Sequence, residues 1–198
     1  MSEVSAKLVQ ELRQKTGAGM MDCKVALRES KGNLEEAIEY LRKKGLKDLG
    51  KRSGKVAAEG TIGIYLHHGN QIAALVELNC ETDFVARGDD FQKAARDLAM
   101  HVAAANPLYL SEEQVPASVL EREKSNIKKY FSDVCFLSQN YVRDESGKLT
   151  VKEVLDQLSV KSGEKVVVRR FQRFEVGEGV EKKGQNFAAD VASIIEGN

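Results

Sequence analysis

Several residue types that would assign a chain to a specialised class are scarce in this sequence. Among its 198 residues there is no tryptophan, and there are only two prolines and three cysteines. The cysteines are Cys23, Cys80 and Cys135, an odd number at wide spacing with no C-x-x-C pair. This pattern argues against a disulfide framework or a zinc site. We therefore expect three reduced, mostly buried thiols.

The sequence also lacks an excess of either charge and any long apolar run. Its 30 Lys and Arg residues balance 30 Asp and Glu residues, so the composition predicts no polyanionic partner. No segment approaches the ~18 consecutive apolar residues of a membrane span. Residues 1–4 lack the basic and then apolar order of a signal peptide. We expect a cytoplasmic protein without a membrane association.

What is present are alternating helical and strand patterns, which predict an α+β protein. Residues 1–45 predict three short helices that end near Gly17, Gly32 and Gly45, the third one capped by Asn33. We expect this module to be followed by a basic linker at 46–56, an α+β core at 57–176 and a helical tail at 177–198. The apolar stripe of the tail is Phe187, Val191, Ile194 and Ile195.

The core pattern predicts a small antiparallel sheet with packed helices. Alternation over 61–66 and 72–78 predicts two strands joined by a two-residue turn at Gly69–Asn70. A helix from Asp89–Asp90 should end at Asn106–Pro107. Further along the chain we expect a charged helix at 119–130, an extended piece at 134–137, a helix from Thr150 to Gly163, and a strand at 165–176.

One stretch, Cys80–Arg87, predicts a functional loop between a rigid strand and a rigid helix. Its centre is Thr82–Val85, in which the carboxylate of Asp83 precedes the ring of Phe84. A plain turn would carry Gly, Asn or Ser at these positions. Two interpretations follow: Phe84 is a buried anchor of the loop, or it is exposed to a partner.

Three other features suggest alternatives to a protein-binding role. Residues 42–55 are basic, which permits binding of RNA or the ribosome, although no aromatic residue is interleaved for stacking. Cys80 could be a nucleophile, but no base adjoins it in sequence. The pair Gly17-x-Gly19 lacks the preceding strand of a dinucleotide loop. Because no catalytic constellation or cofactor motif emerges, we expect a binding protein that is not an enzyme and needs no cofactor.

The sequence resembles the bacterial translation elongation factor Ts family. The resemblance rests on four stretches, of which the first and third are the most specific: 12–24, 58–60, 77–85 and 168–171 continued at 177–179. It covers nearly the whole chain, and the ending 177–198 is most similar to cyanobacterial and plastid members. The resemblance implies nucleotide exchange on the GTPase elongation factor Tu, with no direct contact to nucleic acid.

The resemblance also implies roles for individual residues. The first three helices should form a module similar to ubiquitin-associated domains. The loop Thr82, Asp83, Phe84 and Val85 should displace Mg²⁺ from elongation factor Tu. The module should bind the partner's nucleotide-binding domain, and the residues that we assign to this contact are Leu12, Arg13, Gly19, Met20 and Met21. Because adjacent methionines point about 100° apart on a helix, at least one of them should be exposed.

The chain departs from the family pattern at Lys124–Asn126, where we expect a longer helical segment with a Gly-Lys-Pro turn. The second core half and the coiled-coil insertion of longer members are also missing. Members this short should complete their sheet by pairing with a second copy, so a homodimer is expected.

Overall fold

The computed structural model describes residues 4–52 and 54–180. The N-terminal module contains α1 (Ala6–Thr16), α2 (Met20–Glu29) and α3 (Leu34–Arg52). Local signals set the helix ends: Gly17 closes α1 with φ 69°, and the Asn33 side chain accepts from the backbone N–H groups of Glu35 and Glu36. These helices enclose a separate small core: Val9, Leu12, Cys23, Ala26, Leu27, Ala37 and Leu41.

The third helix is longer than the sequence predicted. We expected Gly45 to end it, but α3 continues to Arg52, so the linker predicted at 46–56 is helical as far as Arg52. The glycine serves close packing instead, because a Cβ at Gly45 would lie 2.7 Å from a methyl group of Val160 on α8 (Val151–Ser162). A helix interior tolerates glycine at a cost of ~1 kcal/mol, which this close approach of two helices offsets.

The core contains an antiparallel sheet in the order β1 (Glu59–Leu66), β2 (Ile72–Cys80) and β3 (Val167–Glu175). The predicted hairpin is present, but its loop is longer than two residues. The turn spans His67–Asn70, with Gly69 at φ 89° and the Asn70 N–H bonded to the His67 carbonyl.

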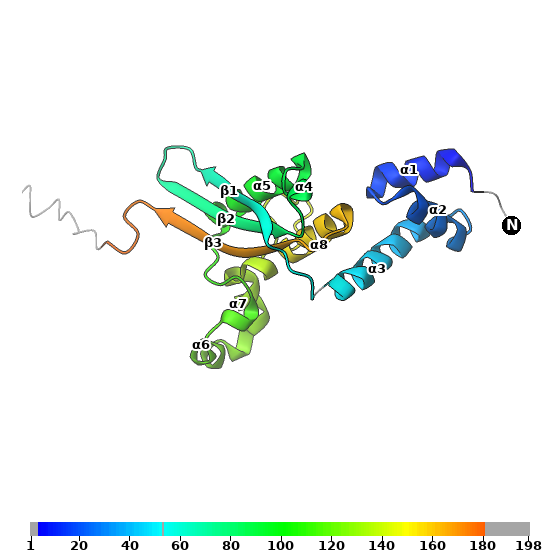
Figure 1. The fold of residues 1–198 in the computed structure, drawn as a ribbon. Coiled ribbons are helices and arrows are strands. Elements are labelled where there is room, and N and C mark those ends of the chain that lie inside the picture. Colours follow the sequence, from blue (N-terminus) through cyan, green and yellow to red (C-terminus); the bar gives the residue numbers. More distant parts are fainter. Residues whose placement is uncertain (1–3, 53, 181–198) are drawn as a thin grey trace, which may run out of the picture.

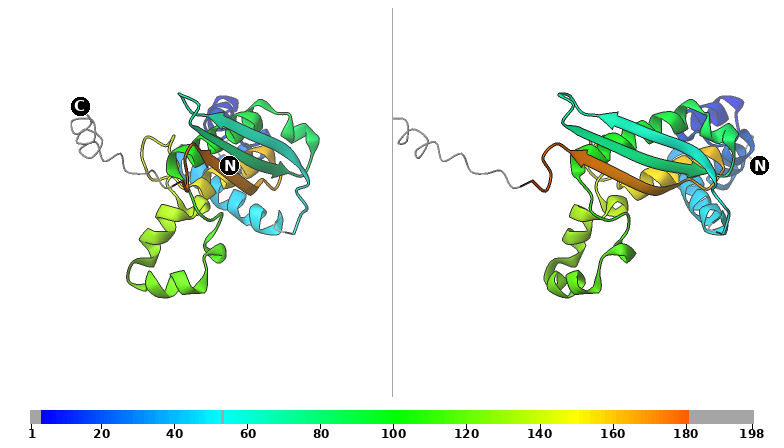
Figure 2. Two further views of the ribbon diagram at one scale, coloured as in Figure 1. Left: turned by 90° about the vertical axis from the view of Figure 1, so that its left-hand side faces the viewer. Right: turned by 60° about the vertical axis from the view of Figure 1, so that its left-hand side comes forward.

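One face of the sheet is covered and the other is open. The right-hand view of Figure 2 shows α5 (Asp89–Ala105) and α8 behind the strands. Phe91, Leu98 and Val102 of α5 are buried in the main core. The predicted start of α5 is confirmed, and so is its end, where Asn106 adopts φ 46°. The predicted start of α8 after Thr150 and its end at Gly163 are also confirmed, and the structure adds a capping box between Thr150 and Glu153.

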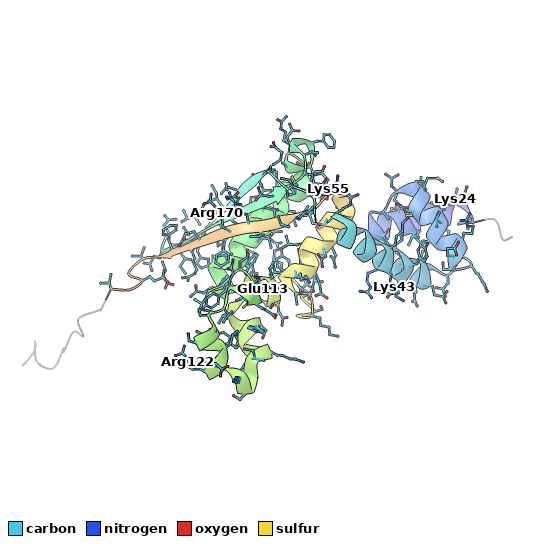
Figure 3. The ribbon with its side chains drawn as sticks, turned by 60° about the horizontal axis from the view of Figure 1, so that its bottom comes forward. Lys24, Lys43, Lys55, Glu113, Arg122 and Arg170 are labelled. Carbon is cyan, nitrogen blue, oxygen red and sulfur yellow. The ribbon has the colours of Figure 1, made fainter. Side chains whose placement is uncertain are left out.

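A helical arm extends from the core between α5 and α8. The sequence predicted one helix at 119–130, but the arm is broken into α6 (Ala117–Arg122), η2 (Lys124–Asn126) and α7 (Ile127–Val134). Figure 3 shows Arg122 on this arm, away from the sheet. The predicted extended piece at 134–137 is instead the short 3-10 helix η3 (Phe136–Ser138); another, η1 (Glu112–Gln114), precedes α6.

The predicted α+β class is confirmed. The tail helix predicted at 184–196 lies outside the described residues, and the boundaries of the four predicted units stay predictions.

Candidate functional site

The Thr82–Val85 stretch follows β2 directly and forms the start of a helical turn. Thr82 is extended, with φ −127° and ψ 153°, and its hydroxyl accepts from the Val85 N–H at 3.4 Å. This cap starts the one-turn helix α4 (Asp83–Ala86). The predicted loop is therefore a capped turn, because threonine can bond the N–H three residues ahead. We call Thr82–Ala86 the 82–86 turn.

This turn separates inward-facing from outward-facing side chains. Ala86 is buried and Val85 packs against the main core, whereas Phe84 is 85% exposed. The interpretation of Phe84 as a buried anchor is therefore wrong. Asp83 is also exposed and pairs with Arg87 at 2.9 Å, an i,i+4 contact in solvent. The turn thus exposes an aromatic ring beside a carboxylate to solvent.

The buried thiol of Cys80 lies beneath this turn. Its Sγ donates to the Thr82 carbonyl at 3.1 Å. Burial raises the pKa of Cys80 to about 11, and the negative charge of Glu164 acts in the same direction. A thiol with this pKa is protonated at neutral pH, which contradicts a nucleophilic role. All three cysteines are free and buried, as predicted.

The end of the turn is joined to the start of α5. The Gly88 N–H donates to the Val85 carbonyl at 3.0 Å, and the Gln92 side-chain amide donates to the Ala86 carbonyl at 2.7 Å. Since α5 is anchored in the core by buried residues, these two bonds fix the C-terminal side of the turn.

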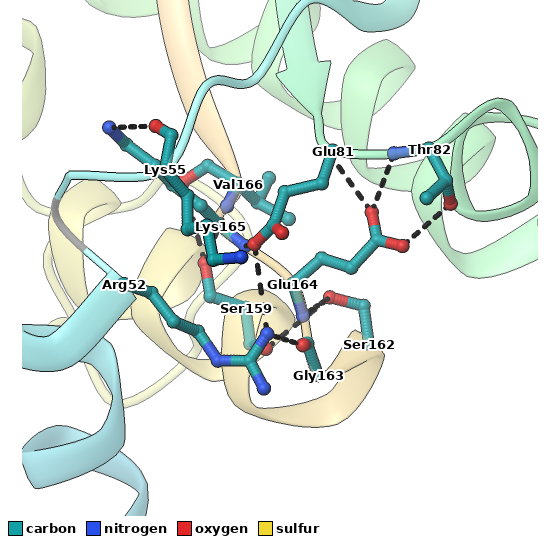
Figure 4. A network of polar contacts seen from close by, with 10 residues as sticks. All are labelled: Arg52, Lys55, Glu81, Thr82, Ser159, Ser162, Gly163, Glu164, Lys165 and Val166. Carbon is teal, nitrogen blue, oxygen red and sulfur yellow. Dashed lines mark hydrogen bonds and ion pairs between the residues drawn. The ribbon is translucent and has the colours of Figure 1, made fainter.

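The N-terminal side of the turn is held by Glu164, a residue that the sequence analysis missed. Figure 4 shows its carboxylate facing Glu81 and Thr82. It accepts from the Glu81 N–H and the Thr82 N–H, both at 3.0 Å, and from the Thr82 hydroxyl at 2.6 Å. Glu164 lies just after α8, 82 residues from Thr82, and no local pattern signals this pairing.

The residues that we assigned to partner binding in the module fall into two groups. Leu12 is fully buried in the small core and is inaccessible to a partner. Arg13 and Gly19 are exposed, and so are both methionines, Met20 at 50% and Met21 at 71%. The exposed residues lie on α1 and α2, whereas Phe84 lies on α4 of the core, so the two predicted sites belong to separate units (Figure 1).

The basic segment carries less free positive charge than its composition suggests. Arg42 and Lys43 pair with Glu39, whose pKa falls to about 2 chiefly because Arg42 donates to its carboxylate. Lys44 pairs with Asp22 at 2.5 Å. These pairs are exposed and contribute little to stability, but they reduce the field that would attract RNA.

Two features that other functions would require are missing from the described residues. No group of three His, Cys, Asp or Glu side chains is arranged to hold a metal ion within residues 4–52 and 54–180. In the same part of the chain, no helix has both the length and the apolar character needed to cross a membrane.

Comparison with known proteins identifies the family. The model of the family described as elongation factor TS matches residues 3–129 and 124–178. The elongation factor Ts of Desulforamulus reducens is 45% identical over 218 residues, covering 99% of this chain and 100% of the relative. That of Geobacter sulfurreducens is 47% identical over 212 residues, covering 96% and 97% of the two chains.

A cyanobacterial relative gives the same result. The elongation factor Ts of Prochlorococcus marinus is 47% identical over 217 residues, covering 98% of this chain and 99% of the relative. These alignments are longer than the 198 residues of this chain, so the relatives carry residues that it lacks. The two family matches overlap at 124–129, the segment in which the sequence analysis found the family pattern shortened. The chain belongs to the elongation factor Ts family.

Proposed function

We propose that this protein is a nucleotide exchange factor for elongation factor Tu, and that the 82–86 turn displaces the Mg²⁺ that holds GDP there. The observation that supports this most directly is the 85% exposure of Phe84 on a turn whose neighbours are fixed in the core. An exposed aromatic ring on a rigid support is the type of residue that dominates binding energy at interfaces. This role would place the protein in the cytoplasm.

The coordination chemistry of Mg²⁺ supports a role for Phe84 and Asp83 in displacing the ion. Mg²⁺ requires a near-ideal octahedral shell and bridges protein oxygens to the nucleotide phosphates. Phe84, inserted beside the partner's metal site, would shift those ligands. Asp83 would attract groups that serve the metal and repel the phosphates, since its pairing with Arg87 is exposed and easily exchanged. Neither residue forms a covalent bond, so the protein acts by binding and not as an enzyme.

Exchange of this kind is a linkage between two binding events. A factor that prefers nucleotide-free elongation factor Tu weakens GDP binding by the same factor by which GDP weakens its own binding. GTP can then rebind during translation elongation. The protein needs no cofactor in this scheme.

The N-terminal module would supply affinity for the nucleotide-binding domain of the partner. Met20 and Met21 are both exposed, and methionine adapts its shape to a partner surface. Arg13 lies in the last turn of α1, and Gly19 is the N-cap of α2. Leu12 would act indirectly, by holding α1 on the small core.

The test is release of fluorescent GDP from purified elongation factor Tu. Phe84→Ala should lower the stimulated release rate by at least about tenfold, the loss expected when an aromatic hot spot is truncated. It should leave the protein folded, because so exposed a side chain contributes less than about 0.5 kcal/mol to stability. Leu108→Ala, at a side chain 61% exposed on the core, is the matched control and should exchange normally. Unchanged stimulation by Phe84→Ala would refute the Mg²⁺ mechanism.

The open face of the sheet supports the expected pairing with a second copy. Ile62, Ile64 and Leu66 of β1 are all more than half exposed on one face of one strand. A row of apolar side chains on an uncovered sheet favours association. Sedimentation should show a dimer, and Ile64→Lys should convert it to a monomer; a monomeric wild-type protein at high concentration would contradict this pairing.

No observation on the described residues favours the alternative of RNA binding through residues 42–55.

A further inference from the structure

Two segments that are far apart in sequence are joined by hydrogen bonds beneath the 82–86 turn, and each segment supplies one carboxylate as an acceptor. The Glu164 carboxylate accepts three hydrogen bonds from Glu81 and Thr82, at 3.0, 3.0 and 2.6 Å. In return, the Glu81 carboxylate accepts from the Lys165 N–H at 2.7 Å. We call this reciprocal arrangement of Glu81, Thr82, Glu164 and Lys165 the 81–164 clamp (Figure 4).

The clamp is held in place from both sides. Arg52, the last residue of α3, forms an ion pair with the Glu81 carboxylate at 3.6 Å and donates to the Gly163 carbonyl. The Glu164 N–H donates to the Ser162 hydroxyl at 3.3 Å, which ties Glu164 to the end of α8. Hydrogen bonds to a charged acceptor are about twice as strong as those between neutral groups. The clamp therefore restrains the chain just where it leaves β2.

The 82–86 turn needs such an external restraint. Its helix, α4, has four residues, far below the ~12–15 residues at which an isolated helix becomes marginally stable. The Thr82 hydroxyl caps α4 through a long bond of 3.4 Å to Val85. The same hydroxyl donates its hydrogen to Glu164, so the clamp also fixes the rotamer that makes the cap possible.

The clamp lies at the edge of the core and not within it. The sheet beneath it is already held by the pairing of Asn79 with Val167, and by buried Cys80 and Val168. Thr82 itself is exposed. We therefore expect removal of the Glu164 carboxylate to leave the sheet and the packed helices intact. Only the orientation of the 82–86 turn should lose its restraint.

We propose that Glu164 is a positioning residue for nucleotide exchange: its carboxylate orients the 82–86 turn so that Phe84 points away from the core toward the partner. The proposal rests on the proposed function of this turn. Glu164 touches neither metal nor nucleotide in this scheme and acts through Thr82. A reacting geometry displaced by about 1 Å can cost up to ~100-fold in rate, so the effect should be large.

The experiment measures GDP release from elongation factor Tu over a range of concentrations of the full-length protein. Glu164→Ala should lower the maximal stimulated rate by about 10- to 100-fold, and shift the half-saturating concentration by less than about threefold, because the module still docks. Glu164→Gln keeps an oxygen that can accept from the Glu81 and Thr82 N–H groups, while its amide nitrogen faces the Thr82 hydroxyl as a donor, so it should restore part of the rate. Glu164→Asp, one methylene shorter, should be as slow as Glu164→Ala and serves in its place should that variant not fold. Glu145→Ala, at an exposed glutamate on the core, is the matched control.

A double variant separates positioning from a merely structural role. If Glu164 acts through the ring, Glu164→Ala added to Phe84→Ala should slow release no further. If the two substitutions instead reduce the release rate multiplicatively, the positioning role is wrong. It is also wrong if Glu164→Ala and Glu164→Asp are both fully active while Phe84→Ala is slow. Either result would leave the exchange mechanism standing. A fully active Phe84→Ala would instead refute the proposed mechanism itself, whatever the Glu164 variants do.

Discussion

His101 of α5 makes the stability of the core depend on pH. Its ring is fully buried, and both nitrogens are occupied: Nε2 lies 3.0 Å from the Gln139 side-chain oxygen, and Nδ1 accepts from the Val142 N–H at 3.3 Å. The Gln139 amide nitrogen donates to the carbonyls of Ala105 and Asp133, so its oxygen must face the ring. The neutral tautomer with hydrogen on Nε2 satisfies every bond.

Protonation of this ring would place two donors face to face, because the new Nδ1–H would point at the Val142 N–H. Burial lowers the pKa of His101 below its ordinary value of 6.5, and the bond to Gln139 only partly offsets this effect. The folded state therefore binds fewer protons than the unfolded state. Its stability is fully present above pH 6.5 and is lost as the pH falls below that value. With one proton at stake, the loss approaches ~1.4 kcal/mol per pH unit at most.

Urea unfolding at pH 7.5 and pH 5.5 measures this term. The wild-type free energy of unfolding should fall by at most about 1.4 kcal/mol between the two values. In His101→Gln this pH dependence of the free energy of unfolding should disappear. The test compares the change between the two pH values, so it does not depend on the variant's stability at pH 7.5. A wild-type free energy that does not fall with acid, or a variant that keeps the wild-type slope, would refute the assignment of the neutral buried ring.

Two further predictions concern packing and thiol chemistry. A Cβ on Gly63 of β1 would lie 2.0 Å from the Ala95 carbonyl oxygen of α5, so Gly63→Ala should cost about 3 kcal/mol and lower Tm by roughly 6–12 °C. Gly54→Ala, with no heavy atom within 4 Å, is its control, and equal melting of the two variants would contradict the close approach of α5. Burial raises the pKa of Cys80 and that of Cys135 to about 11, so at pH 8 only about one thiol in a thousand is ionised. Ellman's reagent should therefore modify both slowly until the protein is unfolded in urea, and rapid native labelling of either would refute the burial.

Features set by local chemistry could be predicted from the sequence. The Thr150–Glu153 capping box, the αL end at Gly163 and the start of α5 at Asp89 each depend on residues within one helical turn. Strand periodicity was equally reliable: the strands predicted at 61–66 and 72–78 are present as β1 and β2.

Glycines were harder to interpret, because the same residue serves two purposes. Gly45 was predicted to end a helix, but it allows α3 to approach Val160. Gly69 and Asn70 were predicted to form the whole hairpin loop, but they complete a turn that begins at His67. Whether a glycine provides positive φ or close approach depends on its neighbours in space, which a single sequence does not give.

The candidate site shows the same division between local and long-range causes. Motif and residue type singled out Thr82–Val85, and the structure adds that Phe84 is exposed, which corrects one of the two interpretations left open. Glu164 could not be found in this way, because a glutamate after a helix end has no local feature that distinguishes it from the exposed glutamates elsewhere in the chain. Its role depends on the antiparallel pairing of β2 with β3. This pairing brings Asn79 opposite Val167, so the end of β2 lies beside the start of β3.

That pairing also explains how the 82–86 turn can be both exposed and ordered. An exposed four-residue helix has few apolar contacts of its own, and such segments are usually mobile. Here the sheet register places a carboxylate where three donors of Glu81 and Thr82 converge, so directional hydrogen bonds supply the order that burial cannot. Phe84 is thereby held 85% exposed and accessible to a partner. Under the proposed mechanism, a ring that enters the partner's metal site needs both properties, because ordering a flexible loop on binding would reduce the free energy available to weaken GDP binding.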